Sequence, residues 1–205
     1  MSKATKTILI ILLVLTADQV LKIWIKTTFP LSTENNPAIY ISNWFQIYFV
    51  ENAGMAFGME IFNKLFLTLF RIMAVGFIGY YLWLLLRRDT NMGFIACVAL
   101  IFVGALGNII DSVFYGVIFD SSAGQAAQIF PEGGGYAGWF HGKVVDMFYF
   151  PLFTFPAWLP FLGGEIFFSP VFNLADSAIT VGAILILIFY RQFFKKEEKK
   201  QDVDI

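Results

Sequence analysis

The chain has 205 residues, of which 58% are hydrophobic and only 14% are charged, against about 25% in an ordinary soluble domain. Too few charged residues remain to cover a soluble globule, and the high hydrophobicity excludes a disordered chain. The net charge of -1 offers no basic excess for a nucleic-acid partner. One cysteine and one histidine exclude an intrachain disulfide framework and a cysteine- or histidine-rich metal site. The composition predicts an integral membrane protein of one domain.

Apolar segments long enough to span a bilayer, about 20 residues each, occur four times along the chain. The first segment follows Lys3 and Lys6 but lacks a small-residue cleavage site, so we interpret it as an uncleaved span rather than a removed signal peptide. The predicted spans are about 7–25, 62–86, 93–110 and 171–190, separated by long connections at 26–61 and 112–170 and followed by a charged tail at 191–205.

The basic residues predict the orientation of these spans. Most Lys and Arg residues lie at the two termini and in the short junction 87–92, whereas only Lys26, Lys64 and Lys143 lie near the opposite side. Both termini are therefore expected to be cytoplasmic, and both long connections are expected to lie outside.

The long connections differ from ordinary polar loops. Residues 39–50 are rich in β-branched and aromatic side chains, which predicts one or two strands, and residues 143–150 could form another. Gly, Ala and Ser dominate residues 120–138, which favours a mobile insertion. The stretch 148–168 is packed with Phe, Pro and Trp, which favours a segment lying along the membrane surface or capping the bundle.

Carboxylates in or near a span are costly and usually mark pairs, cavities or sites. At about 1.5 Å per residue, Asp18, Asp111 and Asp176 all lie in the outer half of the membrane. Asp146 follows in the outer connection, where composition alone favours a plain surface acid over a functional residue. Asp18 and Lys22 have the i,i+4 spacing of a structural ion pair, which is the role we favour for them. Asp111 fits a helix cap or loop contact as well as a site residue, whereas Asp176 has no basic neighbour in sequence.

Two carboxylates held close together cannot both ionise easily, so one keeps a proton while the other serves as a general base. This aspartic-protease chemistry needs no metal, thiol or histidine, which suits the composition. Asp146 and Asp176 are the pair that the topology allows at the outer membrane surface. Asn52 could hydrogen-bond an extended peptide, although a turn before a helix is the simpler interpretation.

Five motifs occur in order: TADQVLK (16–22), VENAGMAFG (50–58), GALGNIID (104–111), GKVVD (142–146) and FNLADSAI (172–179). Together they resemble the bacterial lipoprotein signal peptidase family, also called signal peptidase II or prolipoprotein signal peptidase. The resemblance implies an all-α integral membrane protein with four transmembrane helices, a small extracytoplasmic β-cradle and an interfacial segment.

The resemblance also implies an activity, namely that of an aspartic endopeptidase of the bacterial inner membrane that needs no cofactor. Its substrates would be diacylglyceryl-modified prolipoproteins, cut just before the lipid-modified cysteine. Membrane lipid and globomycin-type inhibitors are expected partners, and the protein is expected to be a monomer. By motif the catalytic dyad would be Asp146 and Asp176, and the supporting or substrate-contacting positions would be Asp18, Lys22, Asn52, Gly54, Asn108, Asp111, Asn173 and Ala175.

The chain departs from the family pattern at two places. Ser112 follows Asp111 where the family often has Arg, so a partner for Asp111 or for the substrate would come from elsewhere. The stretch 113–141 is longer than in compact members, and it could either cover or widen the site.

Three rival classes fit the sequence less well. A proton-conducting transporter would need polar residues through the full membrane depth, but residues 95–103 and 181–188 are apolar. An intramembrane protease of the presenilin type would need a G-x-G-D string, which is absent. A lipid-binding scaffold would explain the apolar surface but not the convergent acids. Cleavage or proton flux in proteoliposomes would separate these classes.

Overall fold

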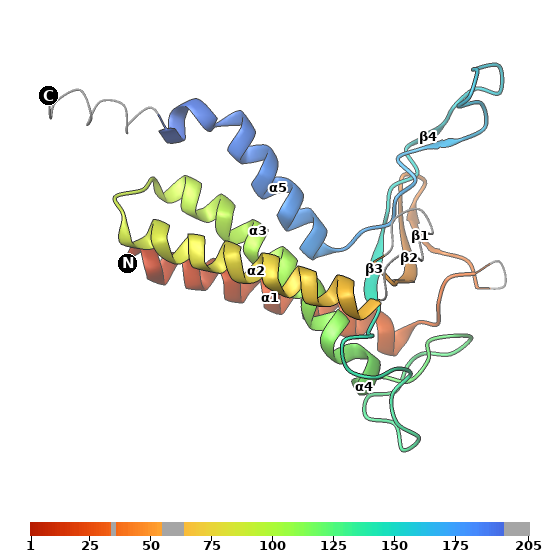
Figure 1. Cartoon of the computed structure of the whole chain (residues 1–205). Helices are drawn as coiled ribbons and strands as arrows, with labels where there is room; N and C mark the ends of the chain where they lie inside the picture. The colour runs from red at the N-terminus through yellow and green to blue at the C-terminus, as the bar shows by residue number, and fades with distance from the viewer. Residues whose placement is uncertain (34–35, 55–63, 195–205) are drawn as a thin grey trace, which may run out of the picture. The chain divides into compact units, whose positions relative to one another are not determined.

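The computed structural model describes residues 1–33, 36–54 and 64–194 (Figure 1). Residues 62–63 of the second predicted span, the end of the VENAGMAFG motif and the tail after residue 194 lie outside the described residues. The contacts divide the chain into two compact units. The helical unit comprises Met1–Asp18, Leu69–Ile109 and Leu174–Ile205, and the sheet unit comprises Gln19–Thr68 and Ile110–Asn173.

Among the described residues, three helices are long and apolar enough to cross a membrane, and a fourth apolar helix is shorter. These are α1 (Lys3–Thr28), α2 (Lys64–Arg87), α3 (Met92–Ile110) and α5 (Leu174–Ile188). The 15 residues of α5 cover about 22 Å, and the helical turn at 190–194 brings this segment close to the roughly 30 Å of a bilayer core. The prediction of four apolar helical segments is therefore confirmed.

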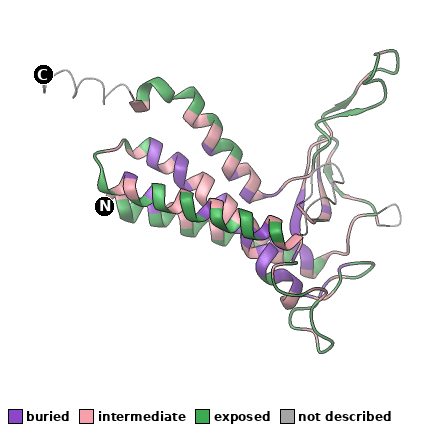
Figure 2. Cartoon of the chain, in the orientation of Figure 1, coloured by how far each residue is buried: buried purple, intermediate pink, exposed green. Residues whose placement is uncertain are grey.

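In the helical unit, many residues of α3 are buried and many residues of α2 are exposed (Figure 2). The exposed residues of α2 include large apolar side chains. Ile95 and Ala99 are fully buried, while Phe77 is 73% exposed. Apolar side chains on an outer face are what a lipid-facing surface requires, because no polar coat is needed there.

Glycine residues allow α3 and α5 to approach each other closely. A Cβ atom on Gly104 would lie 2.3 Å from the carbonyl oxygen of Ala175, and one on Gly182 would lie 2.7 Å from that of Cys97. Small residues permit such close contact between helices, and dispersion contacts then stabilise the pair in a lipid environment.

The sheet unit contains a three-stranded antiparallel sheet in the order β1 (Ile39–Ser42), β2 (Phe45–Asn52), β3 (Val144–Tyr149). The predicted strands at 39–50 and 143–150 are thus confirmed. The core of this unit joins Ile25 of α1 and Phe49 of β2 to Tyr115, Phe119 and Met147. Tyr115 ends the π-helix η2 (Asp111–Tyr115), which continues α3 and leads into α4 (Gly116–Ile118).

The insertion between α4 and β3 is anchored to the rest of the sheet unit. Ala127 N–H donates to the Lys26 carbonyl at the end of α1, and Tyr136 N–H donates to the Phe119 carbonyl, each at 2.9 Å. Composition favoured a mobile insertion here, and these bonds do not support that prediction. The composition of residues 120–138 indicates low helix and strand propensity, but it contains no information about hydrogen bonds to segments far away in sequence.

The aromatic stretch after β3 forms a hairpin of β4 (Phe153–Thr154) and β5 (Ile166–Phe167). Trp158 is 78% exposed and Phe161 is fully exposed in the connection between these strands. The location of this hairpin at a membrane surface stays a prediction.

Candidate active site

Asp146 lies inside β3 with only 2% of its surface exposed. Asn173 Nδ2 donates to one carboxylate oxygen at 2.6 Å, and Asn52 Nδ2 donates to the other at 3.2 Å. A buried carboxylate is costly unless hydrogen bonds replace its hydration. The two amides therefore offset part of this cost and hold the Asp146 carboxylate in one orientation.

The strand register explains how Asn52 reaches Asp146. Val50 pairs with Asp146 across β2 and β3, so Asn52, two residues further along β2, is a diagonal neighbour on the same face. Gly54 N–H donates to Asn52 Oδ1 at 2.7 Å, and the φ angle of +80° at Gly54 favours glycine there. Asn52 therefore both closes the predicted turn and contacts Asp146, while its role in binding a peptide stays a prediction.

Asp176 lies in the first turn of α5 and is half-buried. Asn108 Nδ2, near the end of α3, donates to Asp176 Oδ1 at 2.7 Å. The partial positive charge at a helix N-terminus also favours a carboxylate at this position. Each candidate catalytic acid therefore accepts a short hydrogen bond from an asparagine amide.

Asp18 stabilises the helix that carries Asp176. Its Oδ1 accepts a hydrogen bond from the Ala175 N–H at 2.9 Å, which satisfies one of the backbone donors that a helix N-terminus leaves without an intrahelical partner. Gly107 makes room for the Asp18 carboxylate, because a Cβ atom there would lie 2.7 Å from Asp18 Oδ2. Asp18 thus caps the helix that carries Asp176, while the supporting roles of Asp18 and Ala175 and the ion pair between Asp18 and Lys22 stay predictions.

Asp111 is fully buried at the start of the π-helix η2. Its Oδ2 lies 2.8 Å from Lys22 Nζ, and its Oδ1 accepts from Gln19 Nε2 at 3.0 Å. The same Oδ2 accepts from the Val145 N–H at 3.2 Å. Asp111 therefore fixes the backbone of β3 directly beside Asp146.

Because Ser112 stands where the family often has Arg, the cation that pairs with Asp111 has to come from another residue. Lys22 provides the cation for Asp111, and Ser112 is itself buried, with its carbonyl accepting from the Gly142 N–H at 2.9 Å. A Cβ atom at Gly142 would lie 2.1 Å from the Asp111 carbonyl oxygen, so the glycine of GKVVD is needed for this close approach. Single π-turns within helices occur frequently at functional sites.

Sequence reasoning missed a second buried ion pair in the sheet unit. Lys26 Nζ pairs with Glu51 and donates to Ser122 Oγ at 2.8 Å, while Lys143 Nζ lies 3.6 Å from Glu51 Oε2. Burial raises the pKa of the adjacent Tyr136 hydroxyl, which keeps that group neutral. Glu51 lies in the VENAGMAFG motif and is opposite Val145 in the register of β2 and β3. Its position next to Asn52 in that motif was the sequence signal that could have identified it as a site residue.

The predicted site residues form two hydrogen-bonded groups, one in each unit, and each group contains one candidate catalytic acid. In the sheet unit these residues are Asp146, Asn52, Gly54, Asn173, Asp111 and Lys22. In the helical unit they are Asp176, Asn108, Asp18 and Ala175.

Known proteins resemble this chain over most of its length. A curated relative named Lipoprotein signal peptidase from Porphyromonas gingivalis is 58% identical over 186 residues, which cover 88% of this chain and 80% of the relative. A protein with the same name from Amoebophilus asiaticus is 35% identical over 200 residues, covering 94% and 80%.

A solved structure described as "Bacterial membrane enzyme structure by the in meso method at 1.9 A resolution" is also similar. It has a TM-score of 0.60 and 26% identity, and the match covers 90% of this chain and 91% of that chain. The family described as "Signal peptidase (SPase) II" matches residues 10–192. The chain therefore belongs to the signal peptidase II family, a family of multi-pass membrane aspartic proteases that remove signal peptides from prolipoproteins.

Proposed function

We propose that Asp146 and Asp176 form the catalytic dyad of this signal peptidase. The observation that carries the proposal is the position of Asn173, which donates to Asp146 at 2.6 Å and lies three residues before Asp176. Three residues of chain reach no more than about 11 Å, so the chain itself restricts how far apart the two acids can be. The short hydrogen bond from Asn108 to Asp176 supports a fixed orientation for the second acid as well.

The dyad would cleave a peptide bond by activating water. The ionised carboxylate removes a proton from the attacking water, and the protonated carboxyl group donates a hydrogen bond to the scissile carbonyl oxygen. Water oxygen bonds to the carbonyl carbon, and the resulting tetrahedral intermediate loses the amine after that nitrogen receives a proton from the dyad. The products are a carboxylic acid and a free amine, and the dyad regains its single shared proton.

The substrate we propose is a prolipoprotein with a diacylglyceryl-modified cysteine, cut just before that cysteine. The distribution of Lys and Arg supports an orientation with both termini cytoplasmic and the dyad at the outer face of the inner membrane. In this orientation the lipid of the substrate stays in the outer leaflet while the signal-peptide helix approaches laterally. Globomycin-type peptides would bind at the same dyad, and the enzyme would act as a monomer without a cofactor.

Dyad substitutions in proteoliposomes test this proposal. Asp146→Asn and Asp176→Asn should each lower the rate of cleavage of a lipidated prolipoprotein by at least about 10²–10⁴-fold, the range that a positioned acid or base contributes. Asp89→Asn is the matched control, because Asp89 is 76% exposed in the turn between α2 and α3. Thermal unfolding checks that each variant folds. Normal cleavage by either folded dyad variant would overturn the assignment.

A further inference from the structure

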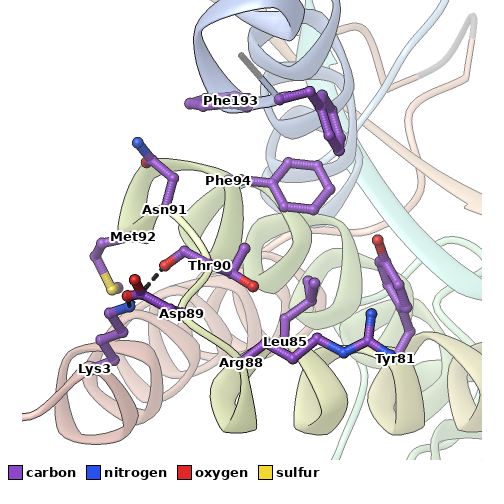
Figure 3. A pocket seen from close by; sticks show the side chains of 11 residues that line it. Lys3, Tyr81, Leu85, Arg88, Asp89, Thr90, Asn91, Met92, Phe94 and Phe193 are labelled. Atoms are coloured by element: carbon purple, nitrogen blue, oxygen red, sulfur yellow. Dashed lines mark hydrogen bonds and ion pairs between the residues drawn. The ribbon is translucent and has the colours of Figure 1, made fainter. Parts of the chain in front are cut away.

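A polar cavity of about 260 Å³ lies in the helical unit, where the start of α1 meets the turn between α2 and α3 (Figure 3). Lys3 Nζ donates to the Thr90 carbonyl at 2.8 Å and lies 3.4 Å from Asp89 Oδ1. Arg88 extends along the other side of the cavity toward Tyr81 (Figure 3). Among the described residues, two basic side chains and one acid line the cavity. Because Asp89 pairs with Lys3, the net positive charge of the cavity comes from Arg88.

An apolar groove of about 400 Å³ lies beside this cavity, between α3 and the α5 segment. Gly93, Ala96, Cys97 and Leu100 form its α3 side, and the first three of these residues are small. Asn91 and Phe193 line both the cavity and the groove. A ligand with a polar end and an apolar chain could therefore occupy both spaces at once.

Aromatic residues on α2 indicate the depth of the cavity in a membrane. Trp83 is 43% exposed, stacks on Tyr80 and carries the Arg87 guanidinium 3.8 Å above its ring. Exposed Trp and Tyr residues gather at the level of lipid headgroups, and basic side chains reach outward from the same level. The cavity, which begins at Tyr81 and Arg88, is thus expected at headgroup depth, whereas the groove runs toward the hydrocarbon.

We propose that this site binds one anionic phospholipid of the surrounding leaflet. Arg88 and Lys3 would hold the phosphate group in the cavity, and one acyl chain would lie along the groove against Ala96 and Cys97. The cavity is slightly smaller than the roughly 300 Å³ at which small-molecule pockets begin, which suits a headgroup whose chains lie elsewhere. A zwitterionic lipid carries its own cation and would compete poorly for the positive cavity.

Lipid titration of the full-length enzyme in a neutral detergent tests this proposal. Phosphatidylglycerol and phosphatidylcholine with identical chains are added to the delipidated protein, and bound lipid is counted by native mass spectrometry. The proposal expects tighter binding of phosphatidylglycerol. Arg88→Gln should weaken that binding about five-fold, the factor that one basic residue contributes at an anionic surface. Ala96→Leu should also weaken it by filling the groove.

Arg87→Gln is the matched control, because Arg87 is adjacent in sequence but packs on Trp83 and does not line the cavity. Lys3→Gln provides a second test if Arg88→Gln fails to fold. Equal binding of the two lipids, or an equal loss in Arg87→Gln and Arg88→Gln, would overturn the proposal. Glycerol phosphate binding as tightly as the lipid would also overturn it, since that result would identify a site for a soluble anion.

Discussion

Removing one partner of the Lys22–Asp111 ion pair should cost more stability than removing one partner of the exposed Lys3–Asp89 pair. The charged atoms of the Lys22–Asp111 pair are 2.8 Å apart, and both side chains are completely buried. Lys22→Met keeps most of the apolar stem but leaves the Asp111 carboxylate without its cation. Removing one partner of a buried pair typically costs about 3–5 kcal/mol, because a buried charge then lacks compensation. Asp111→Asn should cost a similar amount, since it leaves the Lys22 ammonium buried.

The Lys3–Asp89 pair is the internal control for this prediction. Its atoms are 3.4 Å apart and its side chains are 40% and 76% exposed, so Lys3→Met should change the free energy of unfolding by about 1 kcal/mol or less. Reversible unfolding in mixed micelles measures both variants under the same conditions. A double variant, Lys22→Met with Asp111→Leu, should recover only part of the loss, because Gln19 and the Val145 N–H then lose their acceptor.

Two results would refute this reasoning. One is a Lys22→Met protein that is as stable as Lys3→Met. The other concerns cleavage, because Asp111 holds the Val145 N–H beside Asp146. Lys22→Met should therefore slow cleavage even well below its unfolding temperature, and unchanged cleavage there would show that this anchor does not position Asp146.

Three further predictions follow from the packing. Gly104→Ala should destabilise the helical unit by about 1–3 kcal/mol, because its Cβ would lie 2.3 Å from the Ala175 carbonyl oxygen. Gly76→Ala should not destabilise it, because a Cβ there meets nothing within 4 Å. Thermal unfolding compares the two variants. Lys26→Met removes the buried partner of Glu51 and should speed proteolytic cutting of residues 120–136, while Lys6→Met, at an exposed position, should leave the cutting rate unchanged. If the aromatic hairpin lies on the membrane, Phe161→Asp at its fully exposed tip should slow cleavage a few-fold in liposomes but not in detergent. Equal effects in liposomes and in detergent would contradict that placement.

The candidate site was recognised from sequence because its residues lie in short motifs, but their contacts connect different motifs. Asn108 precedes Asp111 by one helical turn, yet its amide donates to Asp176, which lies 68 residues further along the chain. The i,i+4 spacing predicts a pair between Lys22 and Asp18, which stays a prediction, but it does not indicate the Asp111 partner that the structure gives Lys22. Spacing reports neighbours on one helix, and it contains no information about the helix or strand that packs opposite.

The sequence alone predicts membrane helices and strands in this protein, because these depend on the residues within each segment. The low content of charge and the four apolar runs predict membrane helices, and the β-branched and aromatic residues at 39–50 predict one or two strands, because these preferences depend on each segment alone. Only the tertiary structure decided which side chains hold the two acids, that Lys22 supplies the cation for Asp111, and that the insertion is anchored. Those outcomes depend on register and on the close approach allowed at Gly104, Gly107 and Gly142, where segments far apart in sequence come into contact.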